Sequence, residues 1–340
     1  MKMYKNNKPT LRDIARALDL TVPTVSKALR NYDEISDKTK ESVVALAEAW
    51  NYEPNAMALK LRTKKTMVLG VLVSQISNLF YESFLSALEE YARSEGYTLM
   101  ILQSFGDPKE EFKNLEILKR NDVDAVFVSL SSKSCYISEF IQLHEMGTPI
   151  IYFNNVPKIE HCIKITFDGV KIGQMAARAM IINERKKILS VFLNSDSVEA
   201  SDIRLQAFEE KLKKEAPLTT LKVERCRNLE DVEQLIASIF RKNKESYDAV
   251  FCLNDTALIG TIYAFKKLDV DFQKVSVLSV SNGLVPSLFN PLITYIETNG
   301  YKLGKRSFER FLDYQNGNTA YSNDKMDVCL KGDRYKMVVC

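Results

Sequence analysis

TLRDIARALDLTVPTVSKALR, residues 10–30, is the stretch of this sequence that decides the fold of its N-terminal part. Thr10 and the aspartate three residues later form a helix-capping signal, and apolar residues follow at helical spacing. After an interruption at Asp19 and Leu20, Thr21 caps a second helix over residues 22–30, with Pro23 in the first turn, where proline is tolerated. Two short helices across such a turn form a helix-turn-helix.

A third helix is predicted from about Asp37 to Trp50, with Ser36 as its cap. We expect one apolar face of this helix to cover the first two helices. The residues of that face are Val43, Val44, Leu46, Ala47 and Trp50. Three helices of this size can share one small core, so residues 1–53 are predicted to form a helical domain.

The composition describes a globular chain with more than one core. It has 340 residues, of which 46% are hydrophobic and 27% charged, and this length suffices for two or three cores. The start carries no apolar signal region, and no stretch reaches the roughly 18 uninterrupted apolar residues of a membrane span. We therefore expect a cytoplasmic protein with no membrane partner.

Cysteine and histidine give no sign of a metal site, a disulfide frame or a cofactor. The six cysteines are scattered without a C-x-x-C pair, and most stand in apolar runs, where a reduced cysteine behaves as a small hydrophobe. The two histidines, His144 and His161, occur in unrelated contexts and are expected to be structural or solvated. No P-loop, G-x-G-x-x-G or G-x-S-x-G motif occurs, so catalysis has no support.

Positive charge gathers at the N-terminal end. Residues 1–65 contain 13 Lys and Arg against 8 Asp and Glu, and the remainder has a balance of −2. The basic end is therefore the candidate nucleic-acid surface, although an excess of this size is weak support by itself, because many solvated surfaces are as basic.

From Thr66 onward, apolar runs alternate with amphipathic helices, which is typical of a doubly wound α/β domain. The pattern occurs twice, so two similar lobes with a cleft between them are expected. The predicted strands are 67–73, 98–102, 125–130, 149–153, 188–193, 221–225, 249–253 and 275–280. The predicted helices are 80–94, 109–119, 137–145, 169–183, 203–213, 231–241 and 256–268. A final strand at 293–298 and helix at 301–314 should carry the chain back towards the first lobe.

These features together resemble the lac repressor family. The resemblance rests on Thr-Leu-Arg-Asp-Ile-Ala at 10–15, Pro-Thr-Val-Ser-Lys-Ala-Leu at 23–29 and Asn-Tyr-Glu-Pro-Asn-Ala at 51–56, with residues 59–63 beyond. It implies a DNA-binding transcription regulator, in the first instance a repressor, whose two-lobed periplasmic-binding-protein-like domain senses a small-molecule effector. One departure is Asp19, where the family usually has Gly; Asp tolerates the left-handed backbone that this turn needs.

The second helix is expected to read DNA, because its N-terminal residues enter the major groove. Val22 and Pro23 offer apolar surface to a thymine methyl group, and Lys27 can donate to guanine acceptors. Other side chains suit phosphate oxygens, which position the module without reading sequence. These are Thr10, Thr24, Ser26 and Asn31. Val25 and Leu29 are expected on the buried face of the same helix.

Residues 54–65 connect the head to the rest of the chain and are too few for a helix that is stable alone in water. By resemblance they are the family's hinge helix, which pairs with its dimer mate in the minor groove, with Asn55 at the DNA and Leu61 as the wedge between central base steps. An ordinary linker with buried leucines is the alternative. Residues 66–340 are then the effector-binding and dimerisation domain of a homodimer that binds a pseudo-palindromic operator.

Effectors of open α/β sheets bind outside the carboxyl ends of the strands. At such places the resemblance implies seven effector-binding residues. They are Asn78, Phe80, Tyr81, Asp168, Arg204, Asn254 and Asn282. Aromatic faces with Asp, Arg and Asn suit a polyhydroxylated or carboxylated ligand. For any one of these polar residues, a helix cap or a structural ion pair is an equal alternative.

A second departure bears on the ligand. Many family members have Gly-Phe-Asp-Asp after the penultimate strand, but this chain has Ser-Val-Ser-Asn-Gly at 279–283 and so lacks a carboxylate that often accepts sugar hydroxyls. The effector class stays open between sugars, sugar acids or phosphates and other small metabolites. The other class of function is an α/β sugar-binding or sugar-processing protein whose head has no DNA role. The missing secretion signal and catalytic motifs disfavour it.

Replacing Leu61 with Ala tests the hinge assignment. The wedge unstacks a base step and bends the DNA, so its loss should reduce the bend and weaken operator binding by about 1–3 kcal/mol, while the large domain folds unchanged. Gel-shift titration and a bend-angle assay on a selected operator measure both effects. Equal affinity and equal bending in wild type and variant would refute the assignment.

Overall fold

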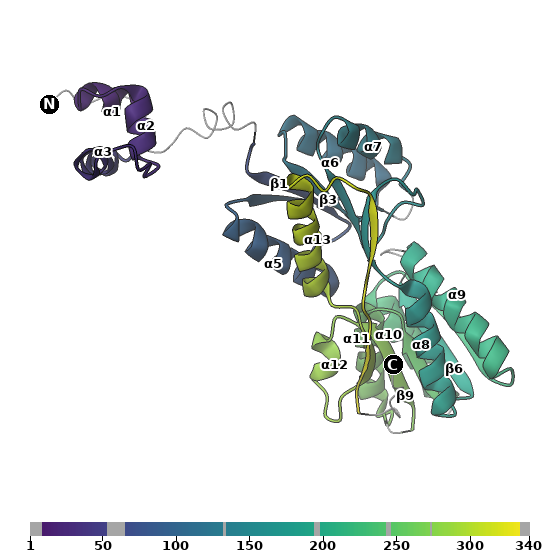
Figure 1. Ribbon diagram of the computed structural model, residues 1–340. Helices are drawn as coiled ribbons and strands as arrows, with labels where there is room; N and C mark the ends of the chain where they lie inside the picture. The colour runs from purple at the N-terminus through teal and green to yellow at the C-terminus, as the bar shows by residue number, and fades with distance from the viewer. Residues whose placement is uncertain are drawn as a thin grey trace. The chain divides into compact units, whose positions relative to one another are not determined.

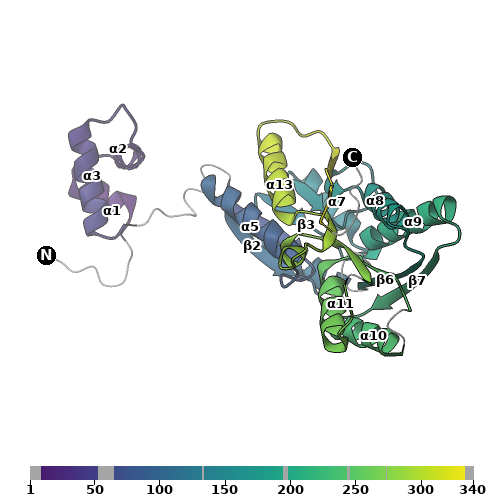
Figure 2. The same ribbon diagram turned by 90° about the horizontal axis from the view of Figure 1, so that it is seen from below.

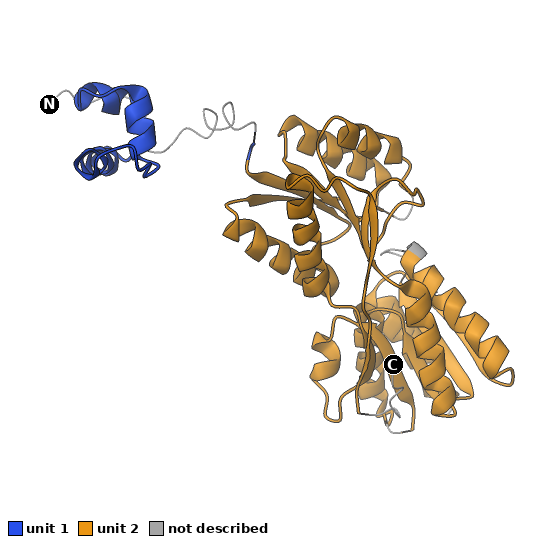
Figure 3. Cartoon of the chain, viewed as in Figure 1, with its two compact units in different colours: residues 1–66 blue, residues 67–340 orange. Residues whose placement is uncertain are grey.

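The computed structural model describes residues 9–52, 65–131, 134–193, 198–242, 246–272 and 274–333, with only the helical backbone at 198 and 199. The chain divides into two compact units, residues 1–66 and 67–340 (Figure 3). Most of the predicted hinge segment, including Asn55 and Leu61, lies outside the described residues.

The head consists of α1 (Leu11–Ala17), α2 (Val22–Ala28) and α3 (Asp37–Ala49). Each helix is capped by a hydroxyl side chain that accepts a backbone N–H from its first turn, and the capping residues are Thr10, Thr21 and Ser36. Such a cap satisfies one of the amide donors that have no partner within the helix. All three predicted caps are confirmed. Asp19 adopts a φ of 53°, the left-handed backbone expected of it.

The core of the head is small and comes from all three helices. Ile14, Val25 and Val43 are fully buried, with Ala15, Ala28 and Ala47 beside them. The expectation that Val44 joins this face is wrong, since its side chain is 39% exposed. Successive helical residues are about 100° apart, so a helix that buries 43 and 47 turns 44 towards solvent.

The 67–340 unit contains two six-stranded sheets, so the doubly wound α/β prediction is confirmed (Figure 1). The first sheet has the order β11-β5-β4-β3-β1-β2 and is parallel throughout. Its strands are β1 (Val68–Val73), β2 (Thr98–Gln103), β3 (Ala125–Val128), β4 (Ile150–Phe153), β5 (Ile163–Phe167) and β11 (Ser322–Met326). We call this sheet and its helices lobe 1.

Lobe 1 buries both faces of its sheet. One core combines the sheet with α5 (Leu79–Ser94) and α13 (Gly300–Gln315), and the other combines it with α6 (Pro108–Arg120) and α7 (Ile137–Glu145). β3 and β4 are buried at every residue, which explains their continuous apolar sequence, because a central parallel strand has helices on both sides.

Lobe 2 repeats the plan with the order β12-β10-β9-β8-β6-β7. Its strands are β6 (Lys187–Leu193), β7 (Thr220–Cys226), β8 (Ala249–Cys252), β9 (Ser276–Ser281), β10 (Thr294–Glu297) and β12 (Leu330–Lys331), of which only the last pairs antiparallel. Its helices are α8 (Gly169–Ile182), α9 (Val198–Glu215), α10 (Leu229–Lys242), α11 (Asp255–Leu268) and α12 (Leu284–Ser287). Figure 2 shows the sheet of lobe 2 between α8 and α9 on one side and α10 and α11 on the other.

The sequence analysis missed β5, β11, β12 and α12. β11 has the sequence SNDKM, and it can be polar because it is the edge strand of its sheet. The predicted return to the first lobe is confirmed, since β10 belongs to lobe 2 whereas α13 packs on α5 of lobe 1.

Helices α8 and α9 of lobe 2 approach closely at Gly173. A Cβ atom added at Gly173 of α8 would overlap the carbonyl oxygen of Arg204 on α9 and would lie 2.9 Å from the Cβ atom of Ala207. Gly173 thus sets the distance at which α9, and with it Arg204, is held against the lobe.

Gly173→Ala should therefore destabilise the 67–340 unit. Alanine favours a helix over glycine by about 1 kcal/mol, but the overlap forces α8 and α9 apart, and overpacking of this kind costs about 1–3 kcal/mol or more. Urea unfolding followed by circular dichroism measures the change. The exposed neighbour Gln174→Ala is the control and should be close to neutral. A Gly173→Ala protein that gains stability would contradict the packing.

Candidate functional site

The N-terminus of α2 presents apolar side chains to solvent. Val22 is 37% exposed and Pro23 is also exposed, whereas Val25 and Ala28 of the same helix are buried in the core. The helix therefore turns the two predicted base-reading residues outward and keeps Val25, expected to be structural, inside. Leu29 packs against the same core and is partly buried.

Several residues predicted to touch phosphate also bond within the head. The Thr10 hydroxyl lies 2.6 Å from Asp13 Oδ2, and the Thr24 hydroxyl lies 2.8 Å from that of Thr21. Hydrogen bonds from Thr10 lower the pKa of Asp13, so the capping carboxylate is held ionised. These contacts order the ends of α1 and α2, where phosphate would bind.

Arg30 is a basic residue that the sequence analysis did not name. It donates to Ser26 through Nη2 to Oγ at 2.8 Å and through Nε to the carbonyl oxygen at 2.9 Å, and its guanidinium lies 5.1 Å from the Tyr32 ring centre. Asn31 next to it is exposed and has a φ of 56°. Ser26, Arg30 and Asn31 thus gather at the C-terminal end of α2.

Lys27 does not stand free on α2. Its ammonium group contacts the Glu34 carboxylate from the loop before α3, with the two side chains 40% and 64% exposed. An exposed pair of this kind is worth about 0–1 kcal/mol. DNA can therefore compete for Lys27 at small cost.

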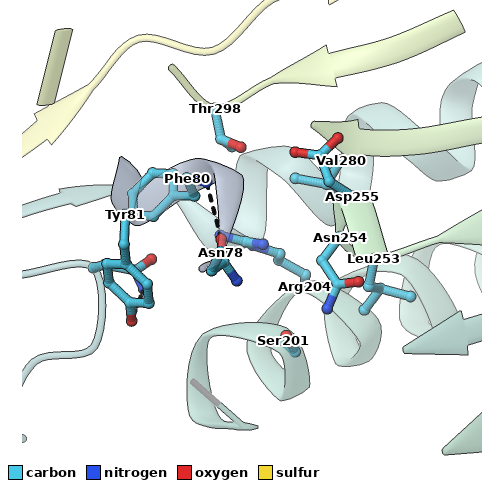
Figure 4. A pocket seen from close by; sticks show the side chains of 11 residues that line it. Asn78, Phe80, Tyr81, Ser201, Arg204, Leu253, Asn254, Asp255, Val280 and Thr298 are labelled. Atoms are coloured by element: carbon cyan, nitrogen blue, oxygen red, sulfur yellow. Dashed lines mark hydrogen bonds between the residues drawn. The ribbon is translucent and has the colours of Figure 1, made fainter. Parts of the chain in front are cut away.

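The second candidate site is a cavity between lobes 1 and 2, which we call the interlobe cavity (Figure 4). It holds about 500 Å³ of space, part of it open to solvent. Its lining residues are Asn78, Phe80, Tyr81, Asn154, Ser201, Arg204, Leu253, Asn254, Asp255, Val280 and Thr298. Most follow the carboxyl ends of strands or begin the next helix, as expected for an open parallel sheet.

Lobe 1 contributes an aromatic wall. Phe80 and Tyr81 meet edge to face with ring centres 5.5 Å apart. The Tyr81 ring is almost fully buried, and its hydroxyl lies 2.9 Å from Ser129 Oγ and accepts from Asn154 Nδ2 at 3.1 Å. Tyr81 therefore braces the wall, and Phe80 supplies its more exposed apolar surface.

Two lining asparagines are also helix caps. Asn78 Oδ1 accepts from Phe80 N at 2.9 Å at the start of α5, and Asn254 Oδ1 accepts from Ala257 N at 2.8 Å at the start of α11. Because capping uses the amide oxygen, the Asn254 amide nitrogen is the atom available to a ligand. The cap and ligand roles of this residue are thus compatible.

Arg204 is the basic residue of the cavity. It is only 8% exposed, and its Nε has no hydrogen-bond partner among the described residues. Burial lowers the pKa of its guanidinium to about 10. Leaving a buried donor of a charged group without a partner is costly, and the Arg204 Nε can donate to an acceptor group that enters the cavity.

Asp255 is a carboxylate in the lining that the sequence analysis missed. Burial raises its pKa, against the lowering effect of hydrogen bonds from Asn282 N, at 3.0 Å, and from the Ser281 hydroxyl. The two residues that replace the family's acidic segment therefore hold Asp255 in place. Its position directly after Asn254 was the available signal.

Two predicted residues do not line the interlobe cavity. Asp168 caps α8 by accepting from Lys171 N at 3.0 Å, and it pairs with Lys325 of β11 at 3.2 Å, with the two side chains partly exposed. Asn282 accepts from Gly300 N at 2.8 Å through its side chain, and its backbone N–H donates to Asp255, which lines the cavity. Asp168, one of the seven predicted effector-binding residues, is therefore absent from the lining that contains Arg204 and Asn254. The latter two do share the cavity.

Other candidate sites offer less. Among the described residues no cluster of His, Cys, Asp and Glu has a metal-binding arrangement. His144 Nδ1 accepts from Ile150 N at 3.1 Å, which is a structural contact. Within the same residues, no helix is long and apolar enough to cross a membrane.

Comparison with known proteins agrees with both parts of the site. Residues 10–55 match the family described as bacterial regulatory proteins, lacI family, and residues 66–326 match that of periplasmic binding proteins and the sugar binding domain of the LacI family. The HTH-type transcriptional repressor PurR of Vibrio vulnificus is 26% identical over 307 residues, which cover 89% of this chain and 91% of the relative.

Two solved structures have the same fold. The lac repressor dimer bound to operator and the anti-inducer ONPF superposes with a TM-score of 0.82 at 18% identity, covering 95% of this chain and 98% of that one. A periplasmic binding protein/LacI transcriptional regulator of Alkaliphilus metalliredigens, complexed with D-xylulofuranose, gives 0.65 at 23% identity, covering 80% and 100%.

A helix-turn-helix head joined to a two-lobed domain with a cavity between its lobes defines a DNA-binding transcription regulator. The chain belongs to the LacI family of bacterial regulatory proteins. The relative named above is a transcriptional repressor rather than an enzyme.

Substitution of Asn254 tests its capping role. Asn254→Ala removes the α11 cap and should lower the free energy of unfolding by about 1 kcal/mol, whereas Asn254→Ser keeps a capping oxygen and should change it by a few tenths only. Urea unfolding of both variants measures this. If the two variants are equally destabilised, the capping assignment fails.

Proposed function

We propose that this regulator represses transcription as a homodimer on a pseudo-palindromic operator, and that a small molecule in the interlobe cavity changes its operator affinity. The observation that carries the proposal is an exposed α2 N-terminus in one unit combined with a cavity lined from both lobes in the other. The related lac repressor was solved as a dimer with operator and an anti-inducer, and two-fold protein symmetry calls for a two-fold symmetric site.

At the operator, Val22 and Pro23 pack against base edges, and Lys27 exchanges Glu34 for a base acceptor or a phosphate. Thr10, Thr24, Ser26 and Asn31 contact the backbone, and Arg30 adds a further charge. Residues 54–65 act as the hinge helix, with Asn55 and Leu61 at the minor groove. This division gives few base contacts and many positioning contacts, as is usual for such interfaces.

Control of DNA binding follows from the lining of the cavity. A ligand that touches Phe80 and Asn78 of lobe 1 together with Arg204 and Asn254 of lobe 2 binds best to one arrangement of the lobes. It thereby shifts the population towards that arrangement, with a coupling free energy of about 1–3 kcal/mol. Residues 66–340 are then the sensing and dimerising domain, and the head is the output.

The function proposed is binding and not catalysis, in the cytoplasm and without a resident metal or cofactor. Among the described residues, the lining offers the guanidinium of Arg204, the carboxylate of Asp255 and amide and hydroxyl groups for recognition. The alternative is a sugar-processing protein whose head does not bind DNA. It gives no role to the exposed apolar side chains at the N-terminus of α2.

Lys27→Ala tests the DNA interface. Operators selected from random duplexes by the full-length protein should contain a symmetric site, protected in a footprint. If Lys27 reads a base, the variant should lose roughly 10-fold to 100-fold in affinity for that site and relax preference at one position per half-site.

Lys38→Ala, which removes an exposed lysine from α3, is the matched control and should keep the same base preference. A uniform loss across all sequences in Lys27→Ala would assign Lys27 to phosphate. Equal protection of random and selected duplexes by the wild type would reject the proposed operator binding.

A further inference from the structure

We infer that the effector is a small anion, a metabolite whose carboxylate or phosphate group is bound by Arg204 in the interlobe cavity. The inference rests on the proposed function, because it assigns a chemical class to the ligand of that cavity.

The first argument is the state of Arg204. Its side chain is more than nine-tenths buried, it lines the cavity, and its Nε has no partner among the described residues. A guanidinium presents five donors in a planar fork that matches a carboxylate or a phosphate. Removing such a group from water without an opposite charge is unfavourable. A ligand that carries a negative charge would supply that opposite charge and would therefore bind favourably.

The second argument is the lack, among the described residues, of a carboxylate that could act as the counter-charge of Arg204. Asp255 is the one acidic side chain of the described lining, and both of its carboxylate oxygens already accept hydrogen bonds from lobe 2, one from Ser281 and one from Asn282 N. Burial raises the pKa of Asp255, against the lowering effect of these two hydrogen bonds. No carboxylate of the described residues contributes to the shifted pKa of Arg204, which has burial as its cause.

The third argument is the polarity of the rest of the lining. Its other polar side chains are asparagines and hydroxyl residues, namely Asn78, Asn154, Ser201, Asn254 and Thr298. The amide oxygens of Asn78 and Asn254 serve as helix caps, and α5 begins at the cavity with the positive end of its dipole. Arg204 and the amide nitrogen of Asn254 therefore bring donors to the cavity, and a carboxylate or phosphate can accept from both.

Size and shape limit the rest of the molecule. The cavity is lined by 11 described residues from both lobes and is partly open to solvent, which points to a small ligand. Phe80 can cover an apolar face of such a compound. Sugar acids and sugar phosphates meet all of these conditions.

Simple anions give the first test. Thermal unfolding of the full-length protein is measured with sodium phosphate and with sodium acetate, each against sodium chloride of equal ionic strength. One of the two anions should raise the Tm of the wild type by about 2–4 °C near saturation, and Arg204→Met should abolish the rise. Arg93→Met removes an exposed arginine from the far part of α5 and should leave the rise intact. The anion that acts distinguishes phosphate from carboxylate.

Matched compounds give the second test. Calorimetric titration compares ribose 5-phosphate with ribose and galacturonate with galactose. We expect an anionic member to bind at least 10-fold more tightly than its neutral partner to the wild type, and no such preference in Arg204→Met. Arg204→Lys should restore part of the preference, because it keeps the charge but loses the planar fork.

Some results would overturn the inference. The first is that neither anion raises the Tm of the wild type more than it raises the Tm of Arg204→Met. The second is that the neutral sugars bind the wild type as tightly as their anionic partners. Asp196→Asn and Glu199→Gln are included because these side chains lie outside the described ones. If the anions raise the Tm only in one of these two variants, Arg204 is paired with that carboxylate in the wild type, and this result also overturns the inference. Operator selection is measured separately. A selected operator without a preference for anions would reject this inference alone, whereas the absence of any selected operator would reject the proposed function.

Discussion

Parallel strand pairing is the constraint on which the 67–340 unit depends. Every strand of lobe 1 and all but the last of lobe 2 run parallel to their neighbours, so each connection must cross over and most do so through a helix. The carboxyl ends of the strands then share one edge of each sheet, and the helices that follow start there. The polar residues that begin these helices, Asn78 and Asn254, come to lie at a common cavity for this reason.

Helix capping and ligand recognition use the same residues in this protein. A helix start needs an acceptor side chain, and in an α/β lobe helix starts are also where ligands bind. Asn254 can serve both purposes because an amide has an acceptor and a donor. Asp168 uses its two oxygens for the α8 amide and for Lys325, and it does not line the cavity. The difference between the two residues is therefore chemical as well as positional.

The contrast between Arg204 and Lys27 shows how burial decides the use of a charge. Lys27 is paired with Glu34 in solvent, where the pair is weak and easily exchanged. Arg204 is buried and forms no ion pair with a described carboxylate, and burial lowers its pKa. The first arrangement suits reversible contact with a polyanion. The second suits a ligand that supplies the missing charge.

The sequence by itself determined the head almost completely. Its helices, caps and turn are local features, fixed by spacing of 3.6 residues, by hydroxyl residues before each helix and by the tolerance of Asp19 for left-handed backbone. The error at Val44 was one of phase, about 100° on a helix. The alternation of apolar runs and helices was also sufficient for the doubly wound class, because central parallel strands must be apolar.

Tertiary structure decided what distant segments do together. β11 has no apolar pattern and exists as a strand only because β5 offers it an edge. The pairing of Asp168 with Lys325 joins residues 157 positions apart, and neither side chain has a local feature that selects the other. The cavity likewise depends on α9 being held against α8 at Gly173, which orients Arg204. Local sequence sets which residues can form helices, strands and caps, but burial and partners of charged side chains depend on packing between elements, which no short stretch of sequence encodes.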